Sequence, residues 1–84
     1  MERYFFHLRK DDQLIVDEEG SEYENKEIAL KAGYADAREF IANQIRAGQL
    51  VLPWSLEITA SDGSLIEKIS FTDFALSLLF QTDR

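Results

Sequence analysis

The stretch WSLEITASDGSLIEKISF, residues 54–71, decides the fold of this chain. Two alternating segments flank Asp62-Gly63, a dipeptide that favours the two-residue type I′ turn of a β-hairpin. That turn would place Glu57 opposite Lys68, which is a favourable charge pair. The other predicted cross-strand pairs are Trp54–Phe71, Leu56–Ile69, Ile58–Glu67, Thr59–Ile66 and Ala60–Leu65.

A second hairpin is predicted at the start of the chain. Residues 3–8, RYFFHL, are aromatic and alternate, and residues 14–16, LIV, are apolar and include β-branched side chains. A three-residue loop at residues 10–12 would fix the register. The predicted pairs on one face are Leu8–Leu14 and Phe6–Val16, and the other face carries Arg3, Phe5, His7, Ile15, Asp17 and Glu19.

A long helix is predicted between the two hairpins. Asn25 is a suitable N-cap, Arg46 suits the negative C-terminal end, and Gly48 suits the position that follows a helix. Residues 49–53 are expected to form an extended connector to the second hairpin. Helical spacing up to Ala47 gives one stripe, made up of Leu30, Gly33, Tyr34, Ala37, Phe40, Ile41, Gln44 and Ile45.

A short helix is predicted after the second hairpin. Ser70 and Asp73 have the spacing of a capping box, and Ile69 and Phe74 have the spacing of a hydrophobic staple. A helix this apolar on all sides needs cover on more than one side. One face holds Phe71, Phe74, Ala75, Leu78 and Leu79, while Leu76 and Phe80 lie off that face.

These elements predict a single small α+β domain over residues 1–84, in the order ββαββ(α). We expect a four-stranded, mostly antiparallel sheet with the long helix packed on one face and a short C-terminal helix. A chain of 84 residues has room for one modest core.

The opening RYFFHL is followed by DEEGSE at residues 17–22, an alanine-rich helix and a D-G hairpin that ends in SFTD. In this combination the chain resembles a family of short bacterial proteins of unknown function, many of them from soil-dwelling and plant-associated bacteria. The resemblance implies a bacterial, cytoplasmic protein, and it carries no known activity, substrate or cofactor.

A second resemblance concerns the layout of the chain. The acidic D-x-x-G turn, a helix of alanines and carboxylates, and then LPWS at residues 52–55 are similar in order to antitoxins with a partial ribonuclease-H-like fold. The chain departs from that pattern after Gly20, and the DNA-binding segment that such antitoxins often append is absent from these residues. The resemblance implies a module that neutralises a basic protein.

Composition argues against several classes of protein. The chain has no cysteine, so disulfides and thiolate metal ligands are excluded. Its net charge of −7 disfavours nucleic-acid binding, because phosphate backbones would be repelled. No leader and no membrane span are recognisable, so we expect a cytoplasmic protein without membrane contact. No phosphate loop or dinucleotide motif is present, so no cofactor is expected.

His7, the only histidine, allows two interpretations. As a metal ligand or general base it would need a partner, and Asp17 is diagonal to it in the predicted register. As a structural residue it would lie on a half-buried β face beside Phe5 and Ile15. Because the sequence offers no ligand set and no nucleophile motif, we expect the structural role, with no metal site and no catalytic residue.

We therefore expect a non-enzymatic, acidic protein-interaction domain that forms a homodimer. Two alternatives stay open at this point. One is an antitoxin-like or inhibitor-like module that binds a basic protein partner, and the other is a small metal- or His-dependent enzyme. The candidate partner or dimer surface consists of Phe5, His7, Ile15, Leu76 and Phe80.

Overall fold

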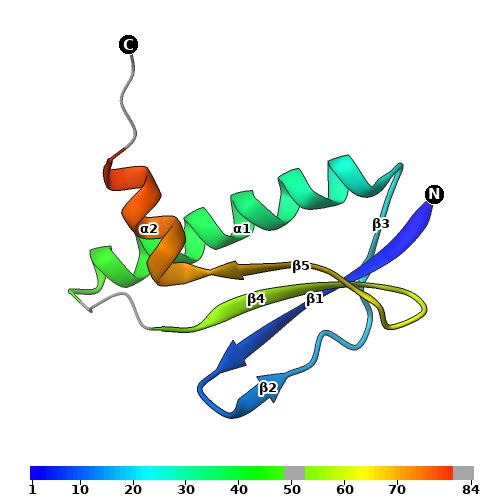
Figure 1. Cartoon of the computed structure of the whole chain (residues 1–84), viewed down its shortest axis with the longest axis horizontal. Coiled ribbons are helices and arrows are strands. Elements are labelled where there is room, and N and C mark those ends of the chain that lie inside the picture. The colour runs from blue at the N-terminus through cyan, green and yellow to red at the C-terminus, as the bar shows by residue number, and fades with distance from the viewer. Residues whose placement is uncertain (49–52, 81–84) are drawn as a thin grey trace.

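The computed structural model describes residues 1–48 and 53–80 of the chain. Its elements are β1 (Glu2–Lys10), β2 (Gln13–Ile15), β3 (Ser21–Tyr23), α1 (Lys26–Arg46), β4 (Ser55–Ala60), β5 (Leu65–Ser70) and α2 (Phe71–Leu79). Figure 1 shows α1 along one face of the sheet and α2 crossing beside it. The predicted α+β class and the two helices are confirmed. The predicted connector lies outside the described residues, except for Pro53.

The sheet is antiparallel and has the strand order β2-β1-β4-β5. The fifth strand, β3, was not predicted, and it pairs with β1 along the same edge as β2. Ile15 pairs with Leu8, and Ser21 pairs with Tyr4. The chain from Ile15 to Ser21 therefore advances by six residues along a part of β1 that advances by only four. Two extra residues therefore bulge out between β2 and β3.

The predicted register of the first hairpin is wrong by one residue. Its loop has two residues, Asp11 and Asp12, and Leu8 pairs with Ile15 instead of Leu14. Asp11 has a φ of 57°, a left-handed conformation that aspartate adopts more readily than most residues. Because a one-residue slip turns every side chain to the other face, Ile15 lies on the α1 side of the sheet.

The second hairpin has the predicted register away from its turn and a different one beside it. The pairs Leu56–Ile69, Glu57–Lys68 and Ile58–Glu67 are confirmed. The register then shifts after Ile58, so that Thr59 pairs with Leu65 and not with Ile66. The predicted pair of Ala60 with Leu65 is therefore wrong, because the strand carries an irregularity where it meets the turn.

The turn itself has three loop residues, 61–63, in place of the predicted two. The Gly63 N–H donates to the Ala60 carbonyl at 2.9 Å, and the Ala60 N–H donates to the Ser64 carbonyl at 3.0 Å. Gly63 has a φ of 87°, which is typical of a type I turn followed by a left-handed glycine. Ser64 donates its hydroxyl and its amide to the Asp62 carboxylate, and these bonds lower the pKa of Asp62.

The core lies between α1 and the central strands. Gly33 of α1 lies against Ile58, so closely that a Cβ atom on Gly33 would be 2.5 Å from Ile58 Cδ1. Ile45 was predicted to face the core, but 61% of it is exposed. The buried apolar residues are Tyr4, Ala29, Ala37, Ile41, Leu56, Ile58, Ile69 and Phe71.

Both helices begin at the predicted caps. The Asn25 side chain accepts from the Ile28 N–H at 2.9 Å, and the Ser70 side chain accepts from the Asp73 N–H at 3.4 Å. Ser70 is also the last residue of β5, so the strand continues into α2 without a loop. Its side chain thus provides an acceptor for one of the N–H groups in the first turn of α2 that have no partner within the helix.

Candidate functional site

The structure divides the five candidate surface residues among three places. Phe5 and His7 lie on the face of β1 opposite α1, with their rings parallel and their centroids 6.2 Å apart. Ile15 is not beside them, since the register of β2 turns it to the α1 side. Leu76 lies on α2 and Phe80 is its C-cap residue. These residues therefore do not form one continuous surface.

His7 holds the bulge between β2 and β3 against β1. The Asp17 N–H donates to His7 Nδ1 at 3.0 Å, and His7 Nε2 lies 3.2 Å from the Thr59 hydroxyl. Because Nδ1 accepts a hydrogen bond, the ring proton is on Nε2, which donates to Thr59. Both ring nitrogens thus have partners within the chain.

The Asp17 carboxylate bonds to backbone amides and not to the imidazole. Oδ2 accepts from the Phe6 N–H at 3.1 Å, and Oδ1 accepts from the Gly20 N–H at 3.1 Å. This role was missed, although the D-x-x-G spacing carries a signal for it, because aspartate side chains often bind amides a few residues ahead. The contact of His7 with the Asp17 carboxylate that the metal or general-base interpretation would need is not made, and His7 contacts the Asp17 backbone N–H instead.

His7→Phe is expected to lower the free energy of unfolding by about 1 kcal/mol, because Asp17 and Thr59 lose a partner while the stacked ring remains. His7→Asn is the matched control, since its Oδ1 takes the position of Nδ1 and is expected to recover part of the loss. Urea unfolding of the three proteins measures the difference. Equal stability of wild type and His7→Phe would contradict the structural role.

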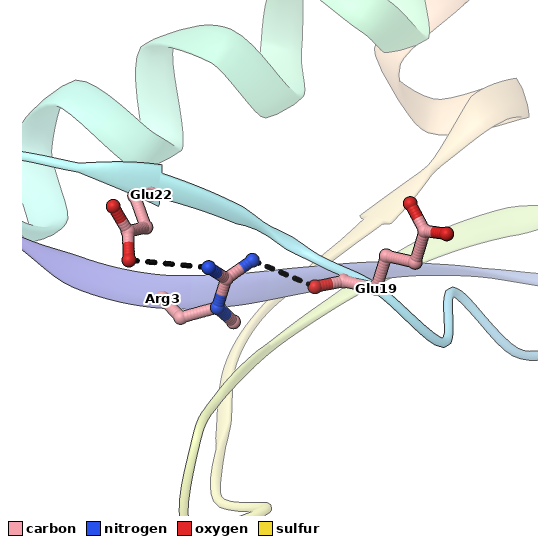
Figure 2. A network of polar contacts seen from close by, with 3 residues as sticks. All are labelled: Arg3, Glu19 and Glu22. Carbon is pink, nitrogen blue, oxygen red and sulfur yellow. Dashed lines mark hydrogen bonds and ion pairs between the residues drawn. The ribbon is translucent and has the colours of Figure 1, made fainter.

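The acidic segment at residues 17–24 is tied to β1 by one cation. Figure 2 shows the Arg3 guanidinium between two partners: it donates to the Glu19 carbonyl at 2.8 Å and to the Glu22 carboxylate at 3.1 Å. Arg3 thus contacts Glu19 through the backbone carbonyl, whereas its cross-strand partner is Glu22. In the part of the chain that the structure describes, no group of three His, Asp or Glu side chains is arranged to hold a metal ion.

The outer side of α2 carries three large apolar residues, Leu76, Leu79 and Phe80. Their exposed fractions are 52%, 76% and 78%, and their i, i+3 and i+4 spacing places them on neighbouring turns. Helical spacing placed Leu79 on the same face as Phe71, but Phe71 is buried and Leu79 is exposed. Figure 1 shows the reason, because the last turn of α2 extends past α1. We call these three residues the outer face of α2.

A shallow groove of 360 Å³ lies between β5 and the inner flank of α2. Within it the Phe74 ring packs edge-on against Tyr34, with 5.2 Å between the ring centroids. The Tyr34 hydroxyl donates to the Glu67 carboxylate at 2.7 Å, and this bond raises the pKa of Tyr34. The groove is lined by Tyr34, Lys68, Ile69, Ser70, Asp73, Phe74 and Ser77.

Comparison with protein families gives one match, to a domain of unknown function, DUF6894, over residues 3–72. The chain belongs to the DUF6894 family. His7, Asp17 and β5 of this DUF6894 domain fall within the matched residues, whereas the outer face of α2 follows them. Comparison with curated proteins and with solved structures gives no significant match. Of the helices within residues 1–48 and 53–80, none has the length and apolar character needed to span a bilayer.

Proposed function

We propose that this DUF6894 domain is a non-enzymatic protein-interaction domain that forms a homodimer through the outer face of α2. The observation that supports this proposal is the exposure of Leu76, Leu79 and Phe80 on one side of a short helix. Three such side chains expose on the order of a few hundred Å², and a contiguous apolar patch of that size often marks an interaction site. We place the protein in the cytoplasm.

The charges along α2 permit a second copy as the partner. The chain carries a net charge of −7, so two copies repel wherever their carboxylates meet. Along α2, residues 71–79, Asp73 is the one charged residue, and it lies in the first turn, away from Leu79 and Phe80. Two α2 helices related by a two-fold axis can therefore pack their apolar ends together without opposing like charges.

Leu76→Glu is expected to weaken the dimer at least tenfold, because it places a carboxylate in the apolar contact. Leu65→Glu is the matched control: Leu65 is 57% exposed but lies beside the hairpin turn at the start of β5. Sedimentation velocity over a wide concentration range would measure both variants and wild type. A wild-type protein that stays monomeric throughout would refute the homodimer.

A second candidate function is binding to a basic protein, as an antitoxin-like or inhibitor-like module. It is favoured by the excess of 16 acidic over 9 basic residues and by the exposed carboxylates of Glu18, Glu19 and Glu24. A pull-down from host lysate at low and moderate salt is the test. A stoichiometric basic partner that is lost at higher salt would support this function over the homodimer.

A further inference from the structure

We propose that the outer edge of β5 is a docking site for an extended, basic segment of another protein, which adds to the sheet as an antiparallel strand. The inference extends the second candidate function and does not depend on the homodimer. It rests on three observations: the direction of the β5 backbone groups, the groove beside them, and the charge of the chain.

The backbone of β5 leaves a row of polar groups unpaired. The Phe71 N–H donates to the Trp54 carbonyl at 3.0 Å, and Leu56 lies opposite Ile69 two residues further along. Hydrogen-bonded and non-hydrogen-bonded pairs alternate along an antiparallel ladder, so Ile69 bonds to β4 while Lys68 faces away from it. Within the described residues no strand pairs with this edge. The Lys68 N–H, the Lys68 carbonyl and the Ser70 N–H therefore point outward.

The groove between β5 and α2 gives an added strand room on the α1 side of the sheet. It borders Lys68 and Ser70, which carry the outward backbone groups, and Ile69 between them. Alternate side chains of an added strand would point into it. There they meet the ring of Phe74 and the carboxylate of Asp73, so the groove suits one apolar and one basic side chain.

Charge selects a basic segment. The net charge of the whole chain is −7, which attracts cationic partners. Among the described residues, no ion pair to Asp73 is formed. The β5 strand of a second copy fits less well in two of its registers. Antiparallel self-pairing centred on Lys68 or on Glu67 would place two like charges directly opposite one another, which destabilises a sheet.

The test uses a capped heptapeptide of alternating valine and lysine, titrated into the ¹⁵N-labelled protein. We expect the largest amide shift changes at Lys68, Ile69 and Ser70, and weaker binding as salt rises. The same peptide with N-methyl groups on alternate residues is expected not to bind, because it cannot complete the ladder. Equal binding of the methylated peptide would overturn the strand addition.

Two variants at one position separate the backbone from the side chain. Lys68→Pro removes the outward N–H but no bond to β4, and proline is tolerated on such an edge, so the fold is expected to persist while peptide affinity falls at least tenfold. Lys68→Ala keeps the N–H and removes a repelling charge, so its affinity is expected to equal or exceed that of wild type. Unchanged affinity of Lys68→Pro would refute the site.

The residues whose amide shifts change distinguish the proposed β5 site from the more general proposal that the chain binds a basic protein. Shifts confined to residues 17–24 would refute the β5 site and leave the binding of basic partners standing. Concentration-dependent shifts at Lys68 without peptide would mean that a second copy occupies the edge, and they would overturn the proposal. Asp73→Asn is expected to weaken binding about two- to fivefold, as for an exposed ion pair.

Discussion

Gly20→Ala is expected to reduce the free energy of unfolding by about 3 kcal/mol. Gly20 has a φ of 68°, a conformation that alanine adopts only with strain. A Cβ atom there would also lie 2.8 Å from the Tyr4 carbonyl oxygen and 2.8 Å from the ring of Phe5. The carbonyl belongs to β1 and cannot move without disturbing the sheet.

Gly63→Ala is the matched control for this prediction. Gly63 has a φ of 87°, but a Cβ atom there would meet nothing within 4 Å. Its substitution is therefore expected to cost only the backbone strain, about 1 kcal/mol. Urea unfolding gives both values, and the difference between them measures the close approach of the bulge to β1. Equal losses would mean that Gly20 is required for its backbone angle alone.

Gly33→Ala is expected to lower the free energy of unfolding by about 2 kcal/mol, even though alanine is the better helix former. The new Cβ atom would lie 2.5 Å from Ile58 Cδ1, and Ile58 is fully buried. The helix or the isoleucine must therefore shift within a close-packed core.

A double-mutant cycle tests the cause of that loss. Ile58→Val removes the clashing Cδ1 atom and costs about 1 kcal/mol alone, so we expect Gly33→Ala with Ile58→Val to be little less stable than Ile58→Val alone. Ile69→Val is the matched control, because its Cδ1 atom lies 3.8 Å from the same Cβ position. Rescue of Gly33→Ala by Ile69→Val as well as by Ile58→Val would contradict the local clash.

The helices were predictable because their signals are local. Asn25 and Ser70 cap the helices as their sequence positions indicate, and the 3.6-residue period gives most of the α1 contacts. The 3.6-residue period of a helix does not predict how far the element packed against that helix extends. Leu79 has the spacing of a core residue but lies beyond the reach of α1, and it is exposed.

The turns were less predictable because one dipeptide serves several loops. Asp62-Gly63 suits a two-residue turn and equally a three-residue loop, since both need a glycine with positive φ at the end. The first hairpin has a two-residue loop although it contains no glycine, and there Asp11 takes the positive φ. Which loop length a turn adopts depends on the twist and pairing of the whole strands, and these are not encoded in the turn residues alone.

The bulge and β3 could not be predicted from periodicity, and the candidate surfaces only in part. β3 is three residues long and largely exposed, so it has no apolar alternation to detect. The bulge is fixed by Asp17, whose partners Phe6 and His7 are ten or eleven residues away. Helical spacing indicated that Leu76 and Phe80 lie off the main apolar face of the short helix. The free edge of β5 could not be predicted in this way, because it depends on the order of the strands in the sheet.

The direct junction of β5 and α2 at Ser70 has a consequence for association rates and affinities. With no linker at this point, α2 is anchored to the sheet by the strand before it and by the buried ring of Phe71. A partner would therefore meet a helix whose orientation is already set, and little conformational entropy would be lost on docking. Contact with α2 would also be transmitted directly to the strand, so that binding at the helix slows amide exchange in β5.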